Sequence, residues 1–310
     1  MYNFFSMKLS IAALLTFSLA GVLAAAPDDL DDSYTKLKDA VEKKDPDAVK
    51  SSAAETLKFA KALQAAPKPA DAEEAKNWEE RVKYGKEVES YTEYALAFTA
   101  EQGLEPAKTI ELIDVLLAQN SKSKYLDDIC ANAYLAALGK SGGSAKQLEG
   151  MAKIAAGRPD NVVALTALVE GYYGKSPGQA LNYANKLVAA ARKAKPEGLA
   201  EADWERARNA ALSTGYYYGG LIYGQRQAWL DCDKNLTAAL PLIAGDQNKT
   251  GAAYFTLGFC KYSFGKLTND RTKMQAGAAL VDKSAAMKNP MQDTAYRTSM
   301  QMKQELSTRH

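Results

Sequence analysis

Apolar residues recur along the chain at three- and four-residue spacing, in stretches that proline and glycine separate. In residues 110–117 (IELIDVLL), for example, Ile110, Ile113 and Leu117 fall on one face of a helix. Alanine, leucine, lysine and glutamate, which favour helices, fill the stretches between the breakers. No run of alternating β-branched residues predicts a strand. The pattern therefore predicts an all-α protein of about 12 helices.

The first 26 residues form a separate unit. Lys8 precedes an apolar run at residues 9–23 (LSIAALLTFSLAGVL), and the small residues 24–26 follow before the acidic DDLDD. A positive start, an apolar centre and a small-residue end are typical of a secretory signal peptide, and the run is shorter than the roughly 20 residues of a membrane span. We predict that residues 1–26 are a cleaved signal peptide, which leaves an exported chain, periplasmic or secreted, without a stable membrane span. An uncleaved anchor is the alternative.

Breakers divide the rest of the chain into three parts. Residues 37–63 predict a hairpin with Pro46 at its turn, and AAPKPADA at residues 65–72 follows it. We therefore predict an N-terminal helical hairpin at 27–66. A region of helix pairs follows at 73–290 and opens with a long helix from Glu73 to about Gln102. The polar segment at 291–310 is expected to be a C-terminal capping helix.

Helix pairs recur within residues 89–290, and the last pair carries the clearest motif. In residues 251–290, Tyr254, Leu257, Gly258 and Gly265 match the aromatic, the L-G pair and the turn glycine of a helix-turn-helix repeat. Residues 268–277 (TNDRTKMQAG) resemble an insertion before the second helix. Further copies begin near residues 213, 161, 128 and 89. Together these copies resemble the tetratricopeptide repeat (TPR), and irregular α-solenoids of Sel1-like or HEAT-like type are the alternative.

The resemblance implies a right-handed α-solenoid of stacked antiparallel helix pairs (TPR-like), covering most of residues 89–290. In this family the first helix of each pair lines the concave side. The carboxylate-clamp form of the family grips a chain-terminal carboxylate with Lys, Asn and Arg. Here Leu165, Val169, Thr214 and Tyr218 occupy the matching places, so the resemblance does not extend to that function.

Charge and histidine content exclude several functional classes. Lys and Arg number 39 against 37 Asp and Glu, a net charge of +2, without the strongly basic field of a nucleic-acid binder. The single histidine, His310, is the last residue, so Ser-His-Asp or Cys-His catalysis lacks a positioned imidazole. The segment Gly174 to Ser176 (GKS) lacks the upstream glycine of a phosphate loop. We expect no nucleic-acid partner, no metal, no cofactor and no enzymatic activity.

The three cysteines allow two interpretations. Cys130, Cys232 and Cys260 form no C-x-x-C pair and no zinc-site spacing. Each could be a small buried hydrophobe. Alternatively, Cys232 and Cys260, on helices expected to be neighbours, could form a disulfide, which export would permit. Cys130 stays free in both cases.

Aromatic residues concentrate in the C-terminal helix pairs and give the candidate site. Tyr217 and Phe255 each follow the motif aromatic by one place, about 100° round the helix. Tyrosine is common at binding surfaces because it offers apolar area and a hydroxyl at low entropic cost. The residues expected to line a partner-binding groove are Tyr172, Tyr173, Tyr217, Phe255, Phe259 and Tyr262. The alternative is that these residues only pack between repeats.

Two functional hypotheses follow from these features. The first is an exported, non-enzymatic TPR-like scaffold that binds a protein or peptide in its concave groove and acts as an adaptor in envelope biogenesis or secretion. The second is an enzyme or receptor whose α/α scaffold encloses a small-molecule or glycan pocket. An open groove lined by the aromatic residues favours the first, whereas a deep pocket with two facing carboxylates favours the second.

Overall fold

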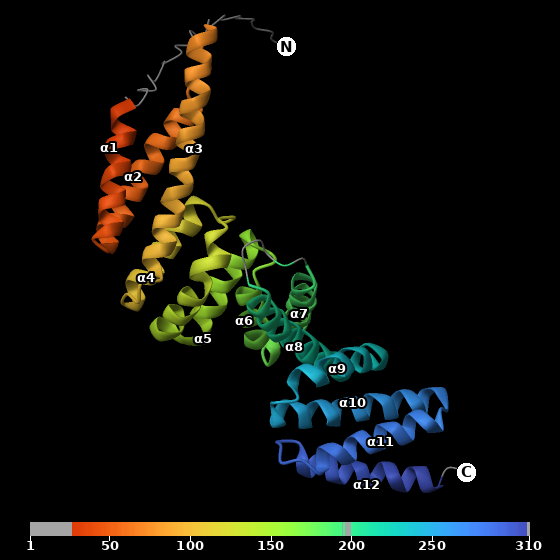
Figure 1. Cartoon of the computed structure of the whole chain (residues 1–310). Coiled ribbons are helices and arrows are strands. Elements are labelled where there is room, and N and C mark those ends of the chain that lie inside the picture. The colour runs from red at the N-terminus through yellow and green to blue at the C-terminus, as the bar shows by residue number, and fades with distance from the viewer. Residues whose placement is uncertain (1–26, 194, 196–199, 309–310) are drawn as a thin grey trace, which may run out of the picture.

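The computed structural model describes residues 27–193, 195 and 200–308, and every regular element in these residues is a helix (Figure 1). The elements are α1 (Pro27–Glu42), α2 (Pro46–Ala65), α3 (Ala72–Ala100), α4 (Pro106–Gln119), the π-helix η1 (Leu126–Cys130), α5 (Ala131–Gly157), α6 (Val162–Tyr173), α7 (Pro177–Ala191), α8 (Glu201–Gln225), α9 (Trp229–Ile243), α10 (Gln247–Thr268), α11 (Arg271–Ala285) and α12 (Gln292–Thr308). The expected all-α class with about twelve helices is confirmed for this part of the chain.

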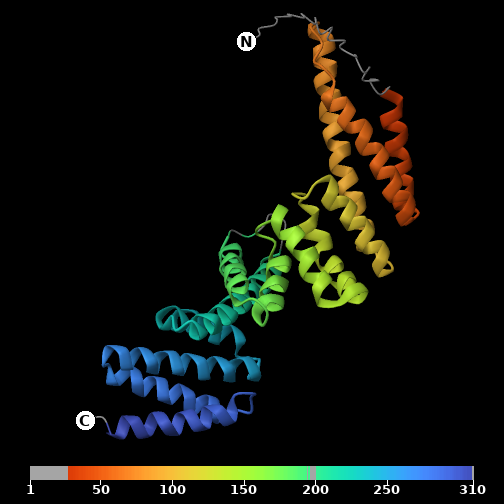
Figure 2. The same cartoon turned by 180° about the vertical axis from the view of Figure 1, so that it is seen from behind.

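The helices follow one another in space in the order of the sequence. Each α-helix packs mainly against the helices before and after it, and contacts that skip one helix, such as α6 with α8, are fewer. Figures 1 and 2 show the result, an elongated row of helices with α1 at one end and α12 at the other. Buried apolar side chains accordingly form successive clusters, one from α1 to α6, one across α8 to α10 and one across α10 to α12.

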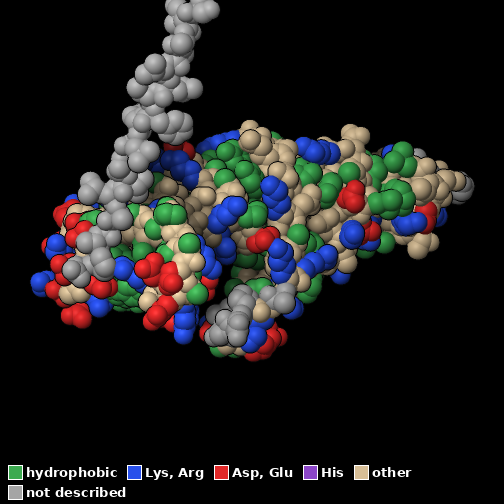
Figure 3. Space-filling view, turned by 90° about the horizontal axis from the view of Figure 1, so that it is seen from above, with side chains coloured by type: hydrophobic (Ala, Val, Ile, Leu, Met, Phe, Trp, Pro, Cys, Tyr) green, Lys and Arg blue, Asp and Glu red, His purple; other side chains and the backbone are tan. Residues whose placement is uncertain are grey.

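The first three helices pack together at the N-terminal end of the row. Pro46 occupies the first turn of α2, where its missing N–H costs nothing, and the Asp45 carboxylate caps that helix. The segment between α2 and α3 is fixed to α3, because the indole N–H of Trp78 donates to the carbonyl of Ala66 at 3.1 Å. Acidic and basic side chains are interspersed over this end of the molecule (Figure 3).

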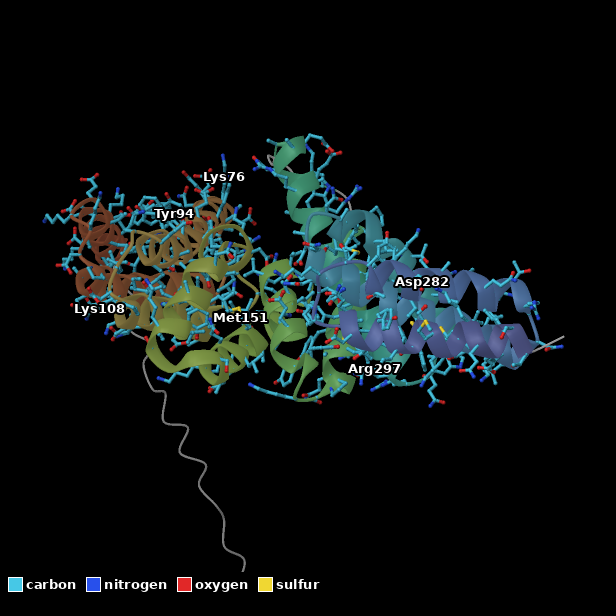
Figure 4. The ribbon with its side chains drawn as sticks, turned by 90° about the horizontal axis from the view of Figure 1, so that it is seen from below. Lys76, Tyr94, Lys108, Met151, Asp282 and Arg297 are labelled. Carbon is cyan, nitrogen blue, oxygen red and sulfur yellow. A yellow bond between two sulfur atoms is a disulfide. The ribbon has the colours of Figure 1, made fainter. Side chains whose placement is uncertain are left out.

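A single glycine turns α5 into two arms. Gly143 has a φ of 67°, a left-handed conformation that costs glycine little because it has no Cβ. The two arms pack through Tyr134, Leu138 and Gly150, where an added Cβ would lie 2.3 Å from the Leu138 side chain. Met151, fully buried, lies within this part of the molecule (Figure 4). The repeat expected near residue 128 is therefore a helix pair formed largely by α5 alone.

Glycines mark the closest approach between the helices of the C-terminal pairs. A Cβ on Gly220 of α8 would lie 2.5 Å from Leu236 of α9, and a Cβ on Gly258 of α10 would lie 2.6 Å from the carbonyl oxygen of Gly277 on α11. In both pairs the missing Cβ of the glycine lets the two helices approach closely.

One detail of the repeat assignment is wrong. Residues 268–277 are not an insertion, because α10 continues to Thr268 and α11 begins at Arg271. The turn between them is short. Asn269 takes a left-handed conformation with φ 52°, and the Asp270 carboxylate caps α11 by accepting from the Lys273 backbone N–H at 3.0 Å.

The last helix packs against α11 through a polar contact as well as apolar ones. Asp282, labelled in Figure 4, lies on α11. It accepts hydrogen bonds from Ser299 and, at 2.8 Å, from Lys303 of α12. The predicted signal peptide, residues 1–26, and His310 lie outside the described residues. None of the helices within the described residues has both the length and the apolar character to cross a membrane.

Candidate functional site

An open cavity of about 650 Å³ lies between α8 and α10, and we call it the aromatic groove. Its walls also include the last residue of α6, Tyr173, and the segment before α12 at Pro290 and Met291. The lining residues are Tyr173, Tyr217, Tyr218, Leu221, Gly224, Gln225, Asn248, Lys249, Ala252, Phe255, Thr256, Phe259, Cys260, Pro290 and Met291. The first helices of three consecutive pairs thus contribute to one surface.

Five aromatic rings dominate the lining and contact one another in two groups. On the α8 side, the ring of Tyr218 lies 4.9 Å from that of Tyr173 and 5.1 Å from that of Tyr217, measured between centroids. On the α10 side, Phe255 and Phe259 stack with centroids 6.5 Å apart, one helical turn from each other. Phe259 remains 42% exposed. Of the five rings, only that of Phe259 is exposed, whereas Tyr217 is buried at 8% exposure and Tyr173, Tyr218 and Phe255 are half-buried.

Polar groups are few but well placed around these rings. Lys249 is the one charged side chain of the lining, and its ammonium lies 6.0 Å above the Tyr217 ring and 3.9 Å from the Asp246 carboxylate. The side-chain amide of Gln225 donates to the Tyr173 hydroxyl at 3.5 Å, and Asn248 supplies a second amide. Rings and amides together suit a ligand that is largely apolar and carries some hydrogen-bonding groups.

The tyrosine hydroxyls of the groove keep their protons at neutral pH. Burial is the largest cause that raises the pKa of Tyr173, Tyr217 and Tyr218 above the usual value. For Tyr217 and Tyr218 the proximity of other tyrosines and of Asp246 adds to the effect. Protonated phenols can both donate and accept hydrogen bonds, so this wall can contact amides and carbonyls alike.

A disulfide supports the floor of the groove. Cys232 of α9 and Cys260 of α10 are joined with an S–S distance of 2.09 Å, and Cys260 belongs to the groove lining. Of the two cysteine interpretations, the disulfide is the one the structure contains, and Cys130 is free and buried. Gly224 of α8 packs against this bond, since an added Cβ would lie 3.3 Å from Cys260 Sγ and 2.8 Å from Thr256.

Four of the six residues expected to line a groove are in this lining, namely Tyr173, Tyr217, Phe255 and Phe259. Tyr172 lies elsewhere and stacks on Tyr183 of α7, with centroids 5.9 Å apart.

Tyr262, also expected in the groove, is only 4% exposed and donates a hydrogen bond to Glu305 of α12 at 2.9 Å. It shares a helical face with Phe255, as expected from the seven-residue spacing, but α11 and α12 cover that part of α10.

The sequence interpretation missed other residues of the groove. The groove position of Tyr218 could have been predicted from the sequence, because it occupies a place that lines the groove in the clamp form of the TPR family. Gln225, Asn248 and Lys249 gave no signal, since they stand at helix ends where polar residues are ordinary.

A second cavity of about 650 Å³ lies beside the groove, between α5, α6 and α8, and we call it the small-residue cavity. Alanine and other short side chains dominate its lining, including Ala167, Ala207, Ala210 and Ala211, and Glu170 is its one charged side chain.

No cluster of three or more His, Cys, Asp or Glu side chains that could hold a metal ion occurs in the part of the chain that the structure describes. Comparison of the chain with family models, with curated proteins and with solved structures found no match.

Proposed function

We propose that this protein is an exported, non-enzymatic scaffold that binds a protein or peptide partner in the aromatic groove. The observation that carries the proposal is the convergence of five aromatic rings, from α6, α8 and α10, on one open cavity of about 650 Å³. Hollows lined mainly by aromatic side chains with a few polar groups are common binding sites. Aromatic anchors in such sites supply much of the binding energy.

The surrounding fold supports a peptide rather than a compact ligand. Helices α3 to α11 pack in sequential pairs, and we interpret them as a right-handed TPR-like α-solenoid whose first helices form the concave face. A solenoid of this kind presents an extended surface. Together with the predicted signal peptide, this favours an adaptor role in envelope biogenesis or secretion, in the periplasm or outside the cell.

A small-molecule or glycan receptor is the alternative. Aromatic rings with the amides of Gln225 and Asn248 nearby would also suit a sugar, whose apolar face stacks on rings while its hydroxyls bond to amides. The openness of the lining toward solvent at Phe259 fits an extended chain better than an enclosed small ligand.

Selection from a phage-displayed library of random peptides tests the proposal. The purified chain should enrich peptides whose binding is lost in the double variant Tyr217→Ala/Phe259→Ala, with helicity by circular dichroism confirming that the variant is folded. Tyr296→Ala/Met300→Ala removes two exposed apolar side chains of α12, 61% and 55% exposed, and should bind as the unchanged protein does. Peptides that bind the groove variant equally well would contradict the proposal. If the protein binds no peptide but binds glycans on an array, and the groove variant loses this glycan binding, the receptor function is favoured.

A further inference from the structure

The aromatic groove and the small-residue cavity adjoin along α6 and α8. On α6, Glu170 belongs to the small-residue cavity and Tyr173, three residues later, to the groove. On α8, Thr214 belongs to the cavity, and Tyr217 and Tyr218 belong to the groove. Residues three or four apart lie on the same helical face, so the two hollows are neighbouring parts of one surface.

Glu170 stands at the border between the two hollows. It is exposed, and it forms no ion pair with another residue in the described part of the chain. Its negative charge acts on Tyr218, because it contributes to the raised pKa of that phenol after burial, the larger cause. Glu170 and Thr214 line the same cavity, and Tyr218 follows Thr214 by about one helical turn on α8. The carboxylate therefore lies on the side of the cavity nearest Tyr218, without an ion-pair partner among the described residues.

The side chain of Lys249 illustrates how a tyrosine ring of the groove contacts a cation. The Lys249 ammonium lies 6.0 Å above the ring of Tyr217 and is balanced by Asp246 at 3.9 Å. Tyr173 and Tyr218, whose centroids are 4.9 Å apart, have the same kind of ring faces but no such cation among the described residues. Instead, they have the unpaired carboxylate of Glu170 nearby.

We infer that the groove's partner is an extended peptide segment carrying a lysine or arginine, whose cation binds between the Glu170 carboxylate and the rings of Tyr173 and Tyr218. On one side of this basic residue, a small apolar residue enters the small-residue cavity. On the other, a larger apolar or aromatic residue contacts Phe255 and Phe259. The inference rests on the proposed function and adds the chemistry of the partner to it.

Charge complementarity and ring geometry support this occupant. A cation over an aromatic face is attracted by the ring quadrupole, and a nearby carboxylate adds a Coulomb attraction. An acidic side chain at the same place would be repelled by Glu170, so the border also selects against peptides of the wrong charge. The apolar hollows on both sides add binding area but discriminate little between basic and acidic peptides.

The test uses the full chain and the random peptide library described above, with charge variants at one position. The strongest groove-dependent peptides should contain lysine or arginine with apolar residues on both sides. For a fluorescein-labelled synthetic copy of the strongest peptide, Glu170→Gln should raise the Kd about 5- to 30-fold and Glu170→Lys more, as expected for a cation held by a ring and a carboxylate. Glu55→Lys, the same charge change at an exposed residue of α2, should leave the Kd within about twofold, the size of a long-range effect screened by salt.

The outcomes separate this inference from the proposed function. Selection on Glu170→Lys should lose the basic preference. Groove-dependent peptides without a basic residue, or a basic peptide whose Kd is unchanged in Glu170→Lys, would overturn the inference and leave peptide binding in place. Failure to find any peptide that depends on Tyr217 and Phe259 would overturn both. If Glu55→Lys weakens peptide binding as much as Glu170→Lys does, the effect arises from the net charge of the protein, and the inference is also overturned.

Discussion

At the scale of single residues, the three cysteines show how position decides chemistry. Cys232 and Cys260 stand on neighbouring helices with Cα atoms 6.4 Å apart and form a disulfide. Cys130 is buried at the end of η1, with Sγ 3.3 Å from the Tyr125 carbonyl oxygen. Burial raises the pKa of its thiol to about 12. The thiolate is the nucleophile, so this cysteine should be inert in the folded protein.

Thiol titration with Ellman's reagent at pH 8 tests both assignments. The folded protein should release essentially no chromophore, because at four pH units below the pKa about one thiol in 10⁴ is ionised, and burial also blocks access. Unfolded in guanidinium without reductant, the chain should show one reactive thiol. After reduction it should show all three cysteines. A reactive thiol in the folded state would contradict the burial of Cys130, and three thiols without reductant would contradict the disulfide.

At the scale of helices, backbone contact between α10 and α11 sets the geometry on which the groove depends. Gly258 and Gly277 face each other so closely that a Cβ on either would lie 2.6 Å from the other's carbonyl oxygen. Backbone cannot move aside as a side chain can, so a methyl group here must push the helices apart. The same α10 carries Phe255 and Phe259, and the separation should therefore disturb the groove.

We expect Gly258→Ala to lower the free energy of unfolding by about 1–3 kcal/mol, the usual cost of overpacking. Gly245→Ala is the matched control, because a Cβ there meets nothing within 4 Å and its φ is not in the left-handed region. That variant should be neutral or slightly stabilising, since alanine reduces the entropy of the unfolded chain. Urea denaturation of both variants measures the difference. Equal stability of the two would show that the α10–α11 contact is looser than described.

Most helix positions, but less of the site, could be predicted from the sequence. Proline marks helix ends by its backbone chemistry alone, so Pro46 correctly placed the turn between α1 and α2. The start of α11 was missed because its first residues are polar, although Asp270 is a typical cap. Periodicity assigns a residue to a helical face, but it does not say which helix covers that face. Tyr262 was misplaced for this reason, since α12 covers it.

At the scale of the whole molecule, stability is distributed along a row. Contacts join mainly neighbouring helices, and the buried clusters are local rather than one common core. In such arrays the free energy is close to a sum of local and nearest-neighbour contributions. Damage at one place should therefore weaken its neighbours and leave distant helices unaffected.

Removal of the disulfide tests this behaviour. The bond closes a loop with a sequence separation of 28 residues, which in the chain-entropy view is worth about 3–4 kcal/mol. In the variant Cys232→Ala/Cys260→Ala, hydrogen exchange should accelerate in α8 to α11, the helices that contain the bond or pack directly on it. Helices α1 to α3 lie at the other end of the row (Figure 1) and should exchange at unchanged rates, so they serve as an internal control. Acceleration of equal size in α1 to α3 would instead mean that the chain unfolds as one cooperative unit, because only global opening couples sites that share no contacts.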